Sequence, residues 1–252
     1  GQLRQADATL AEAAATSLAL GNRAAAAIAL DLRIFAMLQC GRLDDADAIC
    51  QQIIQLADEA GGGVEGSMLS DAYAALSELH HERNDLVAAR LAAEKAIALG
   101  EQWATVEGQI NGGLRLALTL QAQGQAQAAR GAMQQAEQWL QQSSQAHYSF
   151  PWLPPYVAAL SARLALQQGR LDDAHRWADH HLAADADGIS PSSRHFQELE
   201  ELTRAQLRLA LGDPAGAGDV LAVLRPVAEA EGRDGSLIEI DLLRALAWQA
   251  QG

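Results

Sequence analysis

The histidines are the first residues to consider for chemistry, because imidazole is a common metal ligand and general base. Two adjacent pairs, His80-His81 and His180-His181, stand out, and His175 lies five residues before His180. Neighbours on a helix diverge by about 100°, and residues five apart do not share a face as residues four apart do. We therefore expect no metal site. Local spacing also indicates no Ser/His/Asp or Cys/His catalytic arrangement.

Nucleotide-binding signatures are missing as well. The P-loop pattern Gly-x4-Gly-Lys-Ser/Thr does not occur, and Lys95 is the only lysine, which excludes an NTPase P-loop within these residues. Residues 61–66 match the dinucleotide pattern Gly-x-Gly-x-x-Gly by letters, but they follow a helical segment and not a strand, which favours a flexible loop. We expect a chain that binds no cofactor itself and is not an enzyme.

The composition narrows the possible partners and the compartment. The net charge of −14 and the pI of about 4.8 predict repulsion of nucleic-acid backbones. No apolar run is long enough to span a bilayer, so no membrane partner is expected. Cys40 and Cys50 are too few for a disulfide framework, and Cys50 falls on an inward helical position. These features predict a cytoplasmic protein.

A repeat of 40–45 residues organises the whole chain. Its turn markers are Gly1, Gly41, Asn84, Gly124, Gly169, Gly212 and Gly252. An alanine stands five residues after each of the first six markers. A small residue stands seven residues before each marker from Asn84 onward. Glycine and asparagine accept the left-handed conformation of a helix C-cap, and the small residues predict close contact between two helices. Such periodicity is typical of a solenoid.

Each repeat is therefore expected to be a helix, a tight turn and a second helix. No segment shows the alternating pattern of a strand. We predict an all-α fold, an open superhelix of helical hairpins that forms one domain over residues 1–252 and is a fragment of a longer protein. The predicted helices cover residues 2–20, 24–40, 44–60, 67–82, 86–99, 105–122, 126–142, 156–168, 171–184, 195–211, 215–231 and 235–251.

Two segments interrupt the repeat. Residues 143–155 hold half of the six prolines and three aromatic residues, and since proline resists helix, we interpret them as an ordered connection or a binding loop. The aromatic residues either fill a gap between two repeats or cover a ligand. Residues 185–193 are polar and are expected to form an exposed loop.

The repeat resembles the tetratricopeptide repeat, with its central glycine, the alanine five residues later and the small residue of its first helix. The chain is similar, more specifically, to the sensor region of MalT-like LuxR-family transcriptional activators. The segments that carry this likeness are residues 162–178, with Ala162, Gly169, Ala174 and Trp177, and residues 233–252, with Gly235, Ala245 and Gly252, together with Pro151-Trp152-Leu153-Pro154-Pro155.

This resemblance implies a right-handed superhelix within an ATP-dependent transcriptional regulator. It also implies an ATPase module before this region, which would bind ATP, and a helix-turn-helix after it. The region itself would sense a small-molecule inducer, such as an oligosaccharide, or bind a peptide. It would also interact with the regulator's other domains and take part in self-association, without binding nucleic acid.

The resemblance places ligands on the concave face, which the first helices of the hairpins line. Transferred by the register of the turns, the candidate ligand-binding residues are Asp71, Glu78, His81, Asn111, Gln121, Tyr156 and Arg163, with Phe150 and Trp152 as a lid. A mixture of carboxylates, amides and aromatic rings suits a polar, neutral ligand. The alternative is that these residues are the hydrated inner wall of a solenoid without a binding role.

Two other functions compete with the sensor hypothesis. A general tetratricopeptide-like adaptor would bind a protein segment in the same groove. Helical hairpins can also close into an α/α toroid of the glycosidase type, but such enzymes are rich in cleft aromatics and only 4% of this chain is aromatic. Fold alone grants no activity, and we place the enzyme last.

Overall fold

The computed structural model describes residues 2–60, 64–145, 151–185 and 194–251. Every regular element in these ranges is an α-helix and none is a strand, which confirms the predicted all-α helical-repeat fold. The predicted helix ends lie within four residues of the observed ones. The short-range signals of turn and amphipathic period were therefore sufficient to locate every described helix.

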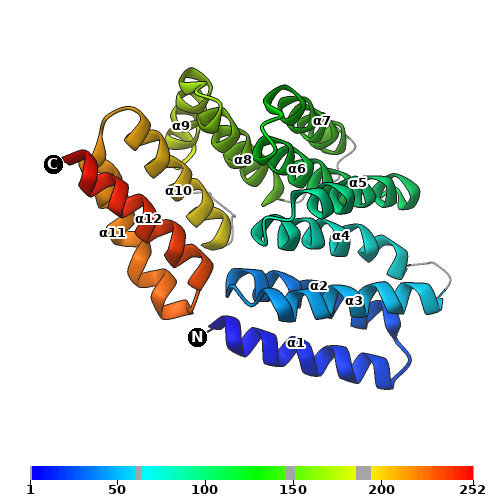
Figure 1. The fold of residues 1–252 in the computed structure, drawn as a ribbon. Helices are drawn as coiled ribbons and strands as arrows, with labels where there is room; N and C mark the ends of the chain where they lie inside the picture. Colours follow the sequence, from blue (N-terminus) through cyan, green and yellow to red (C-terminus); the bar gives the residue numbers. More distant parts are fainter. Residues whose placement is uncertain (1, 61–63, 146–150, 186–193, 252) are drawn as a thin grey trace. The chain divides into compact units, whose positions relative to one another are not determined.

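The chain forms two compact units, which we describe separately. Unit 1 comprises residues 1–142 with 231–235, and unit 2 comprises residues 143–230 with 236–252. The helices that begin in unit 1 follow one another from blue to green in Figure 1: α1 (Gln2–Ala19), α2 (Arg23–Gln39), α3 (Leu43–Ala60), α4 (Val64–Glu82), α5 (Leu86–Trp103), α6 (Val106–Ala122) and α7 (Ala126–Gln145). The remaining helices are α8 (Leu153–Gln167), α9 (Leu171–Asp185), α10 (Arg194–Ala210), α11 (Pro214–Glu231) and α12 (Asp234–Gln251). One domain over residues 1–252 stays a prediction.

The turn markers act as the helix caps that the sequence predicted. Gly41 has φ 69° and Asn84 has φ 58°, both in the left-handed region. The Gly41 amide donates to the Leu38 carbonyl over 3.0 Å, and the next amide, of Arg42, donates to Met37 over 2.9 Å. This pair of bonds satisfies carbonyls at the end of α2, and the same pattern recurs at Asn84. Asn84 is therefore an accepted substitute for glycine at this position.

The repeated small residues lie where the two helices of a hairpin touch. The marker-plus-five alanines of the second helices α3, α5, α7, α9 and α11 are completely buried: Ala46, Ala89, Ala129, Ala174 and Ala217. In the first helices, Ser77, Ala117, Ala162 and Ala205 are buried as well, and so is Ile34, the larger residue at this position in α2. Cys50 is fully buried, as predicted, and burial raises the pKa of its thiol to about 12. The hairpin contact is thus the repeating unit of the core.

The Pro-rich interruption is shorter than predicted, which corrects the interpretation of residues 143–155 as one loop. Helix α7 continues to Gln145, and α8 begins at Leu153, so Pro154 and Pro155 stand in its first turn. Proline is tolerated there because the first amides of a helix have no carbonyl partner within it. The segments 146–150 and 186–193, which include Phe150, lie outside the described residues.

First helices of successive hairpins also contact one another, α2 with α4 and α4 with α6 in unit 1, and α8 with α10 in unit 2. Gly108 of α6 permits the closest approach, because a Cβ atom at this position would lie 2.0 Å from the Ser70 hydroxyl of α4. Side chains of three successive first helices can therefore meet on one surface of unit 1.

Candidate ligand-binding face

Three carboxyl groups from three successive first helices lie within electrostatic reach of one another. They are Asp31 of α2, Asp71 of α4 and Glu107 of α6, and we call them the carboxylate row. The Asn111 amide, one turn after Glu107, donates to the Asp71 carboxylate over 3.4 Å. The structure thus brings together two of the candidate residues, Asp71 and Asn111, which occupy the same register in successive repeats.

Burial makes these carboxyl groups unusually weak acids. It raises the pKa of Asp71 to about 6, against the opposing effect of the Asn111 hydrogen bond. Burial, together with the negative charge of Asp71, raises the pKa of Glu107 to about 7. For Asp31, burial and then the charges of Asp71 and Glu107 hold the pKa well above its ordinary value. Near neutral pH the row therefore holds both protonated and ionised groups, which can donate as well as accept hydrogen bonds.

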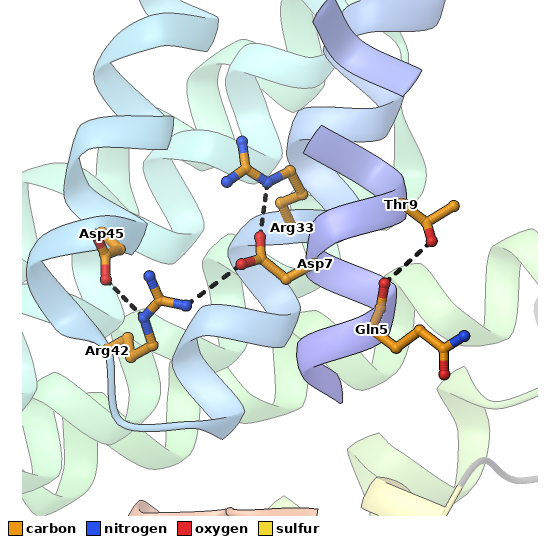
Figure 2. A network of polar contacts seen from close by, with 6 residues as sticks. All are labelled: Gln5, Asp7, Thr9, Arg33, Arg42 and Asp45. Carbon is orange, nitrogen blue, oxygen red and sulfur yellow. Dashed lines mark hydrogen bonds and ion pairs between the residues drawn. The ribbon is translucent and has the colours of Figure 1, made fainter. Parts of the chain in front are cut away.

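The carboxylate row lacks the counter-charges found at other acids of unit 1. Figure 2 shows Asp7 of α1 between two arginines: Arg33 Nε lies 2.9 Å and Arg42 Nη1 lies 3.3 Å from its carboxylate oxygens. Glu78 of α4 likewise pairs with Arg115 of α6 over 2.6 Å. Within the described part of the chain, no such ion pair neutralises a member of the carboxylate row.

The remaining candidates of unit 1 lie away from this row. His81 and Gln121 each stand ten residues after Asp71 and Asn111, respectively, which is about 15 Å along a helix. Nδ1 of His81 is buried and has no hydrogen-bond partner among the described residues. The structure therefore does not bring these two side chains to the carboxylate row.

Unit 2 places an ion pair on its first helices. The Arg163 guanidinium of α8 contacts the Glu239 carboxylate of α12, and Gln206 of α10 donates to the same oxygen of Glu239 over 3.0 Å. Only 18% of the Arg163 side chain is exposed, and burial lowers its pKa to about 10, partly opposed by Tyr156. The arginine remains charged at neutral pH and is neutralised by Glu239.

Three aromatic residues of unit 2 pack together. Trp152 lies parallel to Phe196 of α10, with ring centroids 4.9 Å apart, and Tyr156 meets the edge of Phe196 at 5.3 Å. Tyr156 and Phe196 are buried. The structure thus gives Trp152 and Tyr156 packing partners on α10, while the lid role of Trp152 stays a prediction.

Several members of these clusters were not among the predicted site residues. Glu107 lies one helical turn before Asn111, which was selected by its distance from the turn marker, so the repeat alone did not select Glu107. Arg115 and Phe196 carried no signal of their own, because their roles depend on the residues that face them from other helices. Asp31 lies on α2, which is also a first helix, and its place on that helix was a signal that could have selected it.

Neither a metal centre nor a membrane span emerges from the described ranges. Among residues 2–60, 64–145, 151–185 and 194–251, no three His, Cys, Asp or Glu side chains are grouped as metal ligands would be. Over the same ranges no helix combines the length and apolar character needed to cross a bilayer. The carboxylate row is thus set apart by its protonation and lack of ion pairs, and not by metal geometry.

Comparison with known proteins agrees with the helical repeat. A family model described as the MalT-like TPR region matches residues 1–252. No curated protein matches the chain. The family match covers the paired helices, the capped turns and both clusters described above, and it is the whole-chain match that assigns the family. The chain belongs to the MalT-like TPR region family.

Proposed function

We propose that this chain is the effector-sensing and interaction domain of a MalT-type regulator, and that it binds its ligand on the first-helix face of unit 1. The observation that supports this proposal most directly is the carboxylate row. It places three carboxyl groups and the Asn111 amide on neighbouring helices, and none of these carboxyl groups forms an ion pair within the described ranges. Burying carboxyl groups in this way opposes folding unless a ligand or a proton compensates. Arrangements of this kind are common at functional sites.

The chemistry of the row favours a polar ligand rich in hydroxyl groups, such as an oligosaccharide. With pKa values of about 6 and 7, Asp71 and Glu107 are partly protonated near neutral pH. A hydroxyl group both donates and accepts, so it can pair with either protonation state. Because the row draws on α2, α4 and α6, a bound ligand would favour one relative arrangement of these helices. The regulator's other modules, including the one that binds ATP, would respond to that arrangement.

A second candidate, binding of a protein segment, draws support from an apolar stripe on α2. Ile28, Leu32 and Phe35 are 49%, 51% and 39% exposed, and Asp31 of the carboxylate row lies beside them on the same helix. Helical spacing of exposed apolar side chains is what a docking amphipathic segment needs. In both candidates the domain is a binding module and carries out no reaction.

Titration calorimetry against panels of oligosaccharides and peptides tests the proposal. For a ligand that binds, we expect Asp71→Asn, Glu107→Gln and Asn111→Ala each to weaken affinity at least about tenfold. Glu12→Gln, an exposed change of the same charge on α1, is the matched control and should leave affinity unchanged. Tyr156→Ala and Arg163→Ala test the predicted residues of unit 2. If they abolish binding while the unit 1 variants bind normally, the face of unit 1 is not the site.

A further inference from the structure

Helix α12 exposes an apolar stripe that the repeat normally buries. Ile238, Leu242 and Leu246 are 73%, 59% and 46% exposed, and Ala245 between them is exposed as well. We call these four residues the α12 stripe. They recur every three or four residues and so share one face of the helix. The opposite face, with Ile240 and Ala247, is completely buried against the rest of unit 2.

The register of the turns shows what this face does in the other repeats. Ile238, Leu242 and Ala245 stand 14, 10 and 7 residues before a turn marker. The corresponding residues of α6 are Ile110, Leu114 and Ala117, with exposures of 0%, 1% and 0%, and those of α10 are Glu198, Leu202 and Ala205, with exposures of 4%, 4% and 0%. Each of these helices is followed by the second helix of its hairpin, α7 or α11. The α12 stripe thus continues the hairpin interface of the repeat.

We propose that the α12 stripe docks the second helix of its own hairpin, supplied by a segment of the same polypeptide after residue 252. The proposal rests on the exposure of this face of α12, because the residues at the same register in α6 and α10 are buried. The docking helix should have a small residue opposite Ala245, since the marker-plus-five alanine is completely buried in each second helix from α3 to α11. It should also have an apolar residue four positions later, where Cys50, Ala93 and Leu221 are buried.

A second copy of the chain is the competing occupant. Helix α1 has the register of a second helix, and its marker-plus-five residue Ala6 is exposed, unlike Ala46 or Ala217. The face of α1 in one copy could therefore pair with the α12 stripe of the next. Such an assembly is head-to-tail. Its mass would rise with concentration, which distinguishes it from a helix of the same polypeptide.

The first experiment asks whether the α12 stripe accepts a second helix. Residues 213–231 are appended after Gly252, which then occupies the position that Gly212 holds before α11. Because repeat stability grows through neighbouring interfaces, we expect Tm to rise by about 4 °C or more. The substitution Leu242→Glu should abolish this increase. In the chain without the addition it should change Tm by less than about 1 °C, because Leu242 is already exposed there.

The second experiment asks whether the polypeptide supplies the helix. The chain is expressed together with the residues that its gene encodes next, and deuterium uptake is measured over residues 236–250. Protection of these amides that Leu242→Glu removes is the expected result. No protection, no encoded helix, or no rise in Tm with the appended helix would each overturn the proposal. Analytical ultracentrifugation of the 252-residue chain provides one more test. If the chain assembles as its concentration rises and Leu242→Glu prevents this assembly, a second copy occupies the α12 stripe and the proposal is overturned.

Discussion

The first-helix faces of the two units differ in how they handle buried charge. In unit 1, Asp31, Asp71 and Glu107 lie within electrostatic reach of one another, form no ion pair with any described residue, and have raised pKa values. In unit 2, Glu239 is held by Arg163 and Gln206, and the ion pair is largely buried. The same scaffold of hairpins therefore carries one face with carboxyl groups of raised pKa and one face whose carboxylate is paired with an arginine. The repeat therefore determines the positions of side chains on the first helices but not their charges or hydrogen-bond partners.

The largest expected effect comes from breaking the ion pair between Arg163 and Glu239 in unit 2. Arg163→Met removes the cation and leaves the Glu239 carboxylate partly buried without its partner, which should lower the free energy of unfolding by about 3 kcal/mol. Urea denaturation of the two chains measures this difference. The control Arg90→Met breaks the exposed pair with Glu94, in which each side chain is over 40% exposed, and should cost no more than about 0.5 kcal/mol. Equal losses would mean that burial of the Arg163 pair does not matter.

The second effect separates the helices that assemble the carboxylate row. Gly108→Ala places a methyl group against Ser70, so α4 and α6 must move apart at a cost of about 2 kcal/mol. The control Gly131→Ala, on α7, meets open space and should stabilise by up to about 1 kcal/mol, since alanine is the better helix former. Thermal unfolding measures both. A neutral Gly108→Ala would show that the two helices are not held at this distance.

The third effect is a pH dependence confined to unit 1. The folded-state pKa values of Asp71 and Glu107, about 6 and 7, lie above those of an unfolded chain, so the folded state binds more protons between about pH 4 and 7. Their contribution to stability is complete below about pH 4 and is lost as the pH rises through about 6 to 7. Glu107→Gln removes one of these groups, so it should raise the free energy of unfolding by about 2 kcal/mol more at pH 8 than at pH 5.

Denaturant titrations at pH 5 and pH 8 measure this change. The exposed variant Glu12→Gln removes the same formal charge from α1 and is expected to leave the pH profile unaltered. Identical pH profiles for Glu107→Gln and the parent chain would show that burial does not raise the pKa of Glu107. Arg163 of unit 2, with a pKa of about 10, contributes nothing over this pH range.

The smallest expected effect comes from removing the hydrogen bond that Asn111 donates to Asp71. This hydrogen bond favours the ionised carboxylate. Asn111→Ala should therefore raise the pKa of Asp71, and at 3.4 Å the lost hydrogen bond should cost only about 0.5 kcal/mol at pH 8. Carboxyl NMR of Asp71 follows the titration directly. A lowered pKa of Asp71 would contradict this assignment of the hydrogen bond.

Much of the fold was predictable because its signals are local. A left-handed cap at Gly41 or Asn84 depends on a few neighbouring residues, and so does the apolar period of each helix. The interpretation of residues 143–155 failed because proline was treated only as a helix breaker, whereas Pro154 and Pro155 occupy the first turn of α8. Asp71 and Asn111 both stand 13 residues before a turn marker, and the structure joins them by a hydrogen bond, while their role in binding stays a prediction.

By itself the sequence determined the repeat, its turns and the residues that two helices of a hairpin share, because these follow from backbone conformation and small side chains at fixed spacing. Only the tertiary structure decided which polar groups meet across different hairpins. Asp31 and Glu107 join Asp71 because α2, α4 and α6 pack side by side at a distance that Gly108 permits. Burial and the neighbouring carboxylates, which raise the pKa values of these groups, depend on how separate helices pack and cannot be assigned from local pattern.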